Sequence, residues 1–420
     1  MTRILSDRRL VAVVALALAL RVAVVAATPG YVPQQDAADY DRIARSIAAG
    51  DGYAPTTYAQ PGTPSALRPP GWPVTLGTIY AVTGGSWTAA RLFEAALGAA
   101  TVLLVFLVGR ELRGRRAGLL AAGAAAVFPP LVFSSAALLT EPLFAPLVLL
   151  AVLAVLVLRR RPATMRWALG IGVLGGLAAL TRPTGLPLVF VLALATAAAA
   201  RRPAMAAAVL AASALTVAPW TIRSSTQLDA FVPISTQDGI SAYGTYSPIP
   251  ASRNATWYVP VWLPEVVPLL PRMNEAELDS LLFRRVVRYA AEHPAYPLKA
   301  LGLNSLRIMG VGPQHAAIAE NGYAEMSLDG WWVEVGKWSA RVLAVLVFAA
   351  AVVLLRAGSR RPPLVLWLAP LLMWVSAMSI NAVPRFRTPI DPFLILLVAA
   401  AQGAGERGHA SRSCRSPGAE

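Results

Sequence analysis

The sequence contains few of the residues that soluble enzymes use for their surfaces and for metal or thiol chemistry. It has one cysteine and three scattered histidines among 420 residues. This excludes an intrachain disulfide and a cysteine-based zinc site, and it disfavours a histidine-based metal site. Charged residues make up 14% of the chain, whereas a soluble domain has about 25%. No Walker-type phosphate loop is present. These absences exclude a soluble cytosolic enzyme, a disulfide-stabilised secreted domain and an ATP-driven transporter.

Long apolar runs are abundant instead. Hydrophobic residues make up 56% of the chain, and the mean hydropathy is +0.56. A membrane-spanning helix needs about 20 mostly apolar residues to cross about 30 Å of hydrocarbon. The pattern predicts an all-α polytopic membrane protein with about ten transmembrane helices and two outer-face loop regions. The predicted spans are residues 10–27, 87–109, 117–133, 141–158, 167–180, 186–199, 204–221, 338–355, 364–379 and 389–401.

The distribution of arginine gives an independent test of this topology. The net charge is +15, and all but two of the 37 basic residues are arginines. Short cytoplasmic loops accumulate positive charge, and with the N-terminus inside, every inward segment is basic. The inward arginines are Arg3, Arg8, Arg9, Arg110, Arg113, Arg115, Arg116, Arg159, Arg160, Arg161, Arg166, Arg201, Arg202, Arg356, Arg360, Arg361, Arg407, Arg412 and Arg415. The charge therefore predicts a bacterial-type plasma-membrane protein with both termini cytoplasmic, and no nucleic-acid partner.

This topology divides the chain into four parts. Residues 1–221 form an N-terminal seven-helix transmembrane module, which includes a first outer loop at 28–86. Residues 222–337 form a second outer-face region, residues 338–403 a C-terminal three-helix module, and residues 404–420 a disordered cytoplasmic tail that holds Cys414.

A helix over residues 36–49 is predicted in the first outer loop, with Gly50 as its stop. On that helix Asp36, Asp39 and Tyr40 share one face, because residues three and four apart are neighbours. A carboxylate at the outer surface can act as a general base. The alternative is that the aspartates cap the helix, with Asp39 paired to Arg42. The following stretch, 68–84, is too short to span and predicts an interfacial segment, with Trp72 and Tyr80 at headgroup level.

Four arginines stand where the charge rule predicts few, outside the membrane or at outer helix ends. Each is next to or close to proline, which stiffens the backbone, and arginine offers a planar fork for phosphate oxygens. They predict an anion site at the outer leaflet; the alternatives are snorkelling and ion pairs with Asp391 and Glu141. The four are Arg68, Arg182, Arg385 and Arg387.

Three further ionisable residues fall within predicted spans. Glu141 opens the span at 141–158 and is a substrate-site candidate, because an ionisable group at membrane depth is costly; its alternative is a favourable position at a helix N-terminus. Arg21 and Glu94 are expected to form a structural pair. In the second outer region, Asn274 and Glu277 predict a capping box for a helix that ends near 293–294.

Together these pieces resemble the GT-C membrane glycosyltransferases, especially the bacterial family related to protein O-mannosyltransferases and lipid A aminoarabinose transferases. The resemblance covers most of residues 1–220 and returns near the C-terminal end. The motifs that carry it are Asp36-x-x-x-Tyr40, Gly50-Asp51-Gly52-Tyr53, Arg68-Pro69-Pro70-Gly71-Trp72-Pro73, Leu139-Thr140-Glu141-Pro142, Thr181-Arg182-Pro183 and Arg385-Phe386-Arg387-Thr388-Pro389.

The resemblance implies transfer of a sugar from a polyprenyl-phosphate carrier to an acceptor hydroxyl on the outer face. It favours Asp36 over Asp39 as catalytic base, with the choice between the two left open, and it implies a single inverting displacement, since the phosphate leaves without an acid catalyst. Hydrolytic glycosidases need two carboxylates. The four outer arginines would stabilise the phosphate charge. Relatives often carry Asp-Glu where this chain has Asp36-Ala37, so Asp39 or Glu141 is the candidate for any role of that second acid.

The expected partners are the lipid-linked donor, membrane lipids and a cell-envelope glycan, lipid or protein acceptor. No tightly bound cofactor is implied, and a divalent metal on first-loop carboxylates stays open, as does the choice between hexosyl and pentosyl transfer. The competing hypotheses are a transporter or lipid flippase, which predicts paired, interrupted spans in two related halves, and a catalytically inactive assembly factor. The sequence shows no such halves.

Overall fold

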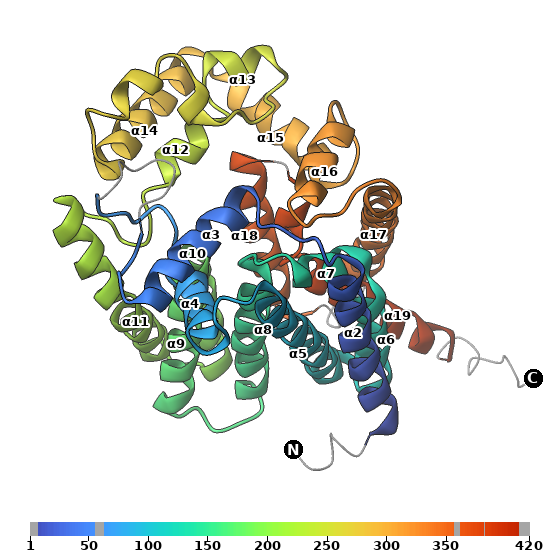
Figure 1. The fold of residues 1–420 in the computed structure, drawn as a ribbon. Helices are drawn as coiled ribbons and strands as arrows, with labels where there is room; N and C mark the ends of the chain where they lie inside the picture. Colours follow the sequence, from blue (N-terminus) through green and yellow to red (C-terminus); the bar gives the residue numbers. More distant parts are fainter. Residues whose placement is uncertain (1–6, 55–62, 357–361, 382, 411–420) are drawn as a thin grey trace, which may run out of the picture.

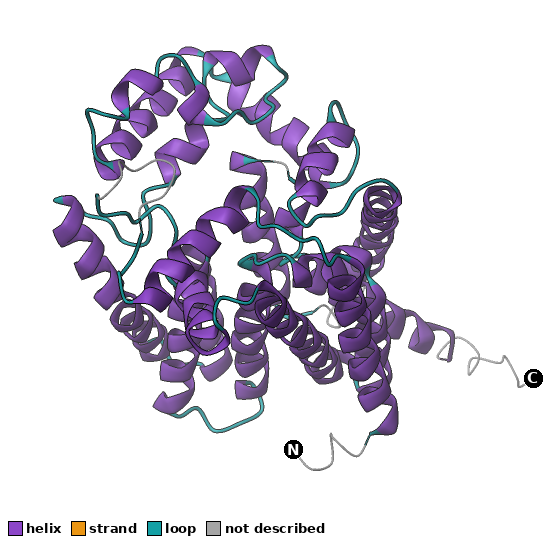
Figure 2. Ribbon diagram, viewed as in Figure 1, coloured by secondary structure: helices purple, strands orange, loops and turns teal. Residues whose placement is uncertain are grey.

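The computed structural model describes residues 7–54, 63–356, 362–381 and 383–410. Within these ranges the chain consists of helices and loops, with no strand (Figure 2). Helices α2, α5 to α11 and α17 to α19 form a bundle, and α12 to α16 form an arch over one end of it (Figure 1). The all-α prediction is confirmed for the described residues.

Each of the ten predicted spans coincides with helical structure. The corresponding elements are α2 (Arg8–Ala27), α5 (Trp87–Arg113), α6 (Arg115–Val127) followed by α7 (Pro129–Phe133) and η1 (Ser134–Ala136), α8 (Glu141–Leu158), α9 (Met165–Thr181), α10 (Gly185–Ala200), α11 (Ala204–Leu228), α17 (Trp331–Arg356), α18 (Val365–Ile380) and α19 (Asp391–Ala410).

Five of these helices are long and apolar enough to cross a membrane: α2, α5, α8, α11 and α17. The segment from α6 to η1 would be a sixth, but it is bent by 65°. Helices α9, α10 and α18 have 16 or 17 residues, which is about 25 Å at 1.5 Å per residue and less than the hydrocarbon thickness. A multi-pass membrane protein is supported, and the count of ten spans stays a prediction.

Small residues allow the bundle helices to approach closely. A Cβ atom at Gly172 of α9 would lie 2.5 Å from the carbonyl oxygen of Val209 on α11, and one at Gly176 would lie 2.6 Å from Thr216. Close backbone approach at small residues is typical of membrane helix packing, since lipid gives no hydrophobic drive for association.

The bend between α6 and η1 explains two buried charges, and it corrects the expected pairing of Arg21 with Glu94. Arg21 donates to the carbonyl oxygens of Ala126 and Leu131 at 3.3 and 3.2 Å. Glu94 accepts the backbone N–H groups of residues 137–139 at 2.8–3.0 Å. The bend interrupts the helical hydrogen bonds, so buried polar side chains must satisfy the freed backbone groups.

The first outer loop contains α3 (Gln35–Ala49) and α4 (Gly71–Thr83). The predicted helix 36–49 is confirmed: α3 ends at Gly50, which has φ +87° in the left-handed region. The interfacial placement of Trp72 and Tyr80 is wrong, since both side chains are buried inside the protein. Trp72 donates to the carbonyl of Leu138, and Tyr80 donates to the carboxylate of Asp41.

The second outer region contains α12 (Asp238–Tyr243), α13 (Pro248–Ser252), η2 (Pro260–Trp262), η3 (Val267–Leu269), α14 (Glu275–Glu292), α15 (Ala295–Ile308) and α16 (His315–Ala324). The capping box at Asn274 and Glu277 is confirmed, with both reciprocal hydrogen bonds at 2.9 Å. Buried leucines of α14 pack against Ile240 and Tyr243 of α12 and give this region its own small core.

Helix α19 extends to Ala410, past the predicted start of the tail at 404. The rest of the predicted tail, residues 411–420 with Cys414, lies outside the described residues, as do Arg3, Arg360 and Arg361.

Candidate functional site

A cavity of about 890 Å³ lies between the bundle and the arch. Its lining comes from segments that are far apart in the sequence: α3, the turn at 67–69, the ends of the bundle helices, α12, α16 and the loop after α18. Six of the eight predicted site residues line it, namely Asp36, Asp39, Tyr40, Arg68, Arg182 and Arg385.

Two of the motifs quoted for the resemblance pack directly against each other. A Cβ at Gly71 would lie 2.8 Å from the carbonyl oxygen of Leu180 and from Oγ1 of Thr181, so only glycine permits this approach of α4 to the end of α9. Arg68 precedes the contact on one side, and Arg182 follows it on the other. The contact therefore brings two arginines from distant segments to one cavity.

The turn that carries Arg68 is fixed from both outer regions. Tyr53 donates its hydroxyl to the carbonyl of Arg68 at 2.5 Å. Glu275, at the start of α14, accepts the hydroxyl of Ser65 at 2.6 Å and the backbone N–H groups of Ala66 and Leu67 at 2.9 and 3.1 Å. Glu275 is buried. No sequence motif singles out Glu275.

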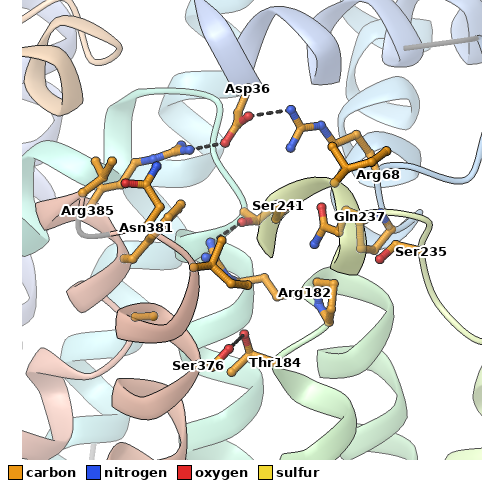
Figure 3. A pocket seen from close by; sticks show the side chains of 18 of the residues that line it. Asp36, Arg68, Arg182, Thr184, Ser235, Gln237, Ser241, Ser376, Asn381 and Arg385 are labelled. Atoms are coloured by element: carbon orange, nitrogen blue, oxygen red, sulfur yellow. Dashed lines mark hydrogen bonds and ion pairs between the residues drawn. The ribbon is translucent and has the colours of Figure 1, made fainter. Parts of the chain in front are cut away.

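Asp36 lies between two arginines (Figure 3). One oxygen accepts from Arg68 at 2.5 Å, and the other pairs with Arg385. Burial alone would raise the pKa of Asp36, but the two guanidinium groups outweigh it and hold the pKa below its ordinary value. In this arrangement Asp36 is ionised and strongly held, with 26% of its side chain exposed.

Asp39 is one turn further along α3 and is less accessible. It pairs with Arg68 at 2.9 Å and with Arg42 at 2.6 Å, and 8% of its side chain is exposed. Asp39 thus forms the predicted pair with Arg42 and also lines the cavity. Tyr40 lies beneath the guanidinium of Arg68, which is 5.4 Å from its ring centroid, and burial raises the pKa of Tyr40 to about 12.

Glu325 is a site residue that sequence reasoning missed. It follows α16 and lines the cavity, with 2% of its side chain exposed. It pairs with Arg385 at 3.1 Å and accepts the backbone N–H of Asp36 at 3.1 Å. Burial raises the pKa of Glu325 to about 8, although Arg385 opposes the shift. An isolated glutamate in a polar loop carries no periodicity or motif, so only the tertiary contact identifies it.

Arg182 and Arg387 have different environments. Arg182 lines the cavity, pairs with Glu141 at 2.7 Å and donates to the hydroxyl of Thr140 at 2.7 Å. Glu141 is fully buried behind it. Arg387 is also buried, pairs with Asp391 at 2.7 Å and donates to the carbonyl of Ala340. Arg387 and Glu141 therefore lie behind the cavity wall. Arg182 and Arg387 form the ion pairs with Glu141 and Asp391 that the sequence analysis named as the alternative to an anion site.

The cavity has ends of different character. The α12 side presents polar side chains, Ser235, Gln237 and Ser241 (Figure 3), together with Asp238 and Trp257. The side between α10 and α18 is largely apolar. Its lining residues are Phe144, Leu186, Pro187, Met373 and Ile380, with one hydroxyl pair between Thr184 and Ser376 at 3.0 Å.

The carboxylates of the cavity do not fit a divalent metal ion. Asp36, Asp39 and Glu325 each face a guanidinium group, which takes the position that a cation would need. Across the described ranges, no three histidine, cysteine, aspartate or glutamate side chains are arranged to hold a metal. In this arrangement the neighbouring arginines occupy the positions that a metal on the first-loop carboxylates would need.

Comparison with known proteins gives a family match and a fold. Residues 67–223 match the model of the dolichyl-phosphate-mannose-protein mannosyltransferase family, a stretch that begins beside Arg68 and includes Arg182. No curated protein matches the chain. The matched residues cover the two motifs that meet at Gly71.

Solved structures extend the likeness over almost the whole chain. The apo oligosaccharyltransferase of Archaeoglobus fulgidus is 15% identical with a TM-score of 0.55, covering 97% of this chain and 52% of that one. The archaeal oligosaccharyltransferase AglB from the same organism, in complex with an inhibitory peptide and a dolichol-phosphate, is 14% identical with a TM-score of 0.52, covering 99% and 52%. ArnT from Cupriavidus metallidurans bound to undecaprenyl phosphate is 17% identical with a TM-score of 0.44, covering 94% and 77%.

This chain spans about half the length of the archaeal oligosaccharyltransferase chains. At these identities the likeness shows a common fold. Together with the family match, it confirms the resemblance to GT-C glycosyltransferases that the sequence motifs predicted.

Proposed function

We propose that this protein is a membrane glycosyltransferase that moves a sugar from a polyprenyl-phosphate carrier to an acceptor hydroxyl. The observation that carries the proposal is the composition of one cavity: three arginines lie with the carboxylates of Asp36, Asp39 and Glu325 where a polar end joins an apolar end. A lipid-linked sugar phosphate has the same three parts, a polar sugar, an anion and an apolar chain. The dolichol-phosphate in an archaeal structure of the same fold supports this reading.

In this proposal the phosphate binds near Arg182 and Arg385, the prenyl chain lies between α10 and α18, and the sugar faces Gln237 and Ser241. Arginine guanidinium groups give charge-assisted hydrogen bonds to phosphate oxygens. As the bond between the anomeric carbon and the phosphate breaks, negative charge grows on the phosphate, and the preorganised arginines stabilise it. The leaving group needs no proton, so one carboxylate suffices.

Asp36 is the proposed base. The acceptor oxygen attacks the anomeric carbon from the face opposite the phosphate and passes its proton to Asp36, which inverts the configuration. In the free protein two guanidinium groups lower the basicity of Asp36. When the phosphate takes up part of the charge of Arg385, that restraint weakens, and donor binding increases the basicity of Asp36.

The test is transfer by purified protein in nanodiscs, supplied with a labelled polyprenyl-phosphate sugar pool and a cell-envelope fraction as acceptor. Asp36→Asn is expected to lower the rate by about 10²–10⁴-fold, the contribution of a general base, with normal insertion and donor binding. Asp51→Asn is the matched control, because Asp51 is an exposed aspartate in the same loop. NMR of the product at the anomeric carbon checks inversion.

Each outcome separates the hypotheses. Full transfer by Asp36→Asn excludes Asp36 as base, and the double variant with Asp39→Asn then decides whether the neighbour serves. Movement of the lipid between leaflets without consumption of the sugar would replace the proposal by the transporter or flippase alternative. A phenotype of the full chain that survives Asp36→Asn would favour an assembly factor.

A further inference from the structure

Arg385 pairs with two carboxylates that come from different outer regions. It pairs with Asp36 from the first outer loop and with Glu325 from the second outer region. Its side chain is 6% exposed and that of Glu325 is 2% exposed. An aspartate, an arginine and a glutamate thus form a row at the cavity wall, with carboxylates at both ends.

Glu325 depends on this arginine for its charge. The charged groups that face it are Arg385 after α18, Asp36 on α3, Glu141 on α8 and Arg68 before α4. Arg385 is its ion-pair partner, and the backbone N–H of Asp36 is its other hydrogen-bond partner among the described residues. The other nearby acids disfavour an ionised Glu325, as does its burial.

A donor phosphate in the cavity would compete for Arg385. A buried carboxylate that loses its counterion is neutralised rather than left charged. A protonated Glu325 can still accept the N–H of Asp36, so the start of α3 stays in place. Glu325 is one of the residues that line the cavity.

We propose that Glu325 is a positioning residue whose ionised form occupies Arg385, so that the donor phosphate reaches Arg385 only when Glu325 carries a proton. The exchange replaces one ion pair, Arg385 with Glu325, by another, Arg385 with phosphate. The arriving negative charge is balanced by the proton on Glu325. The inference rests on the proposed function, because it takes the phosphate of a lipid-linked donor as the competing anion.

The exchange predicts a specific pH dependence of binding. Burial raises the pKa of Glu325 to about 8, so at pH 7 most free protein already carries the proton. At pH 9 only about one molecule in eleven does, and the apparent Kd rises in inverse proportion to the competent fraction. The expected result is a rise in Kd of about tenfold from pH 7 to pH 9.

The experiment measures binding of undecaprenyl methyl phosphate to the full chain in nanodiscs between pH 6 and 9. This phosphodiester keeps one negative charge throughout that range, so the ligand does not titrate. Glu325→Gln is expected to bind as tightly as wild type at pH 7, and about tenfold more tightly than wild type at pH 9, with a pH-independent Kd. Glu320→Gln, an exposed glutamate on α16, is the matched control and should follow wild type.

The outcomes are separable. A wild-type Kd that does not change with pH overturns the exchange, and this measurement does not require any variant to fold. Weaker binding by Glu325→Gln at every pH also overturns it, because that is the result of a purely structural role. Inorganic phosphate that binds as well as the lipid would overturn the assignment to a lipid-linked phosphate. No lipid binding at any pH would remove the proposed function itself.

Discussion

The two outer regions contribute to the cavity in different ways. The first outer loop carries Asp36, Asp39 and Arg68, all of which belong to sequence motifs. The second outer region carries Glu275 and Glu325, which belong to none and are nevertheless buried in contact with the first loop. The first region supplies the charges to which the proposed function gives a chemical role, and the second region contacts and pairs with them.

The contact between the regions explains why the arch is part of the site. Glu275 binds three consecutive residues of the first loop just before Arg68, and Glu325 binds the backbone of Asp36. Movement of the arch would therefore change the geometry of both charges. This difference between the regions leads to four predictions beyond the Asp36 test, in order of expected effect.

Removal of an arginine from the first loop should have the largest effect. Arg68→Ala leaves Asp36 and Asp39 without a shared cation and removes a group that stabilises the phosphate, so transfer should fall by about 10²–10³-fold. Arg68→Lys should recover only part of this loss, because lysine lacks the planar fork. Steady-state transfer rates in nanodiscs measure both. Arg288→Ala, on the exposed face of α14, should be unaffected; an equally active Arg68→Ala would contradict a role of the first loop in phosphate binding.

Loosening the second region should have a smaller effect of a different kind. Glu275→Gln weakens charge-assisted hydrogen bonds worth roughly 1–3 kcal/mol in total, and kcat/KM should fall about tenfold. Because Glu275 does not line the cavity in the structure, donor KM is expected to change more than kcat. Glu292→Gln, at the exposed end of α14, is the control. Lower thermal stability with unchanged kinetics would show that Glu275 supports the fold alone.

Glu325 should make stability depend on pH. Its pKa is raised from 4.5 to about 8 in the folded state, so the folded protein binds more protons than the unfolded chain between these values. Stability should therefore fall as pH rises from about 5 to 8, by on the order of a few kcal/mol. Thermal unfolding in nanodiscs at several pH values measures this. Glu325→Gln should flatten the decline, and Glu320→Gln should retain it; equal declines in all three proteins would refute the assignment.

Removal of divalent metal should have no effect on transfer. The carboxylates of both outer regions face arginines instead of a metal site. Treatment with EDTA, followed by dialysis, is expected to leave the rate within about twofold of the untreated enzyme. A large loss that added Mg²⁺ or Mn²⁺ restores would show that the arginines move away to admit a cation. It would contradict the view that the carboxylates of both outer regions are balanced by arginines.

Much of the fold followed from local pattern. The apolar runs located ten helical segments, although four of them are shorter than a full span or confined to the apolar part of a longer helix. Gly50 marked the end of α3 and Asn274 the start of α14 because capping depends on neighbouring residues alone. The motifs also located Asp36, Arg68, Arg182 and Arg385, which share one cavity.

The pairings could not be obtained in this way. Arg21 and Glu94 were expected to bind each other, but a bend in a third segment offers each of them backbone partners instead. Arg385 and Arg387 are two residues apart, yet one faces the cavity and the other pairs with Asp391 behind it. Sequence spacing gives the position of such a side chain, and only the packing of other elements decides its partner.

By itself, the sequence determined that this is an all-helical chain with apolar helices, a charged first outer loop and the motifs of a GT-C glycosyltransferase. These are properties of composition and local order, where burial of apolar residues and helix caps act within a few turns. Tertiary structure alone decided that Arg385 lies between Asp36 and Glu325. Electrostatic energy depends on distance and burial in space, and Asp36 is separated from the other two residues by most of the length of the chain.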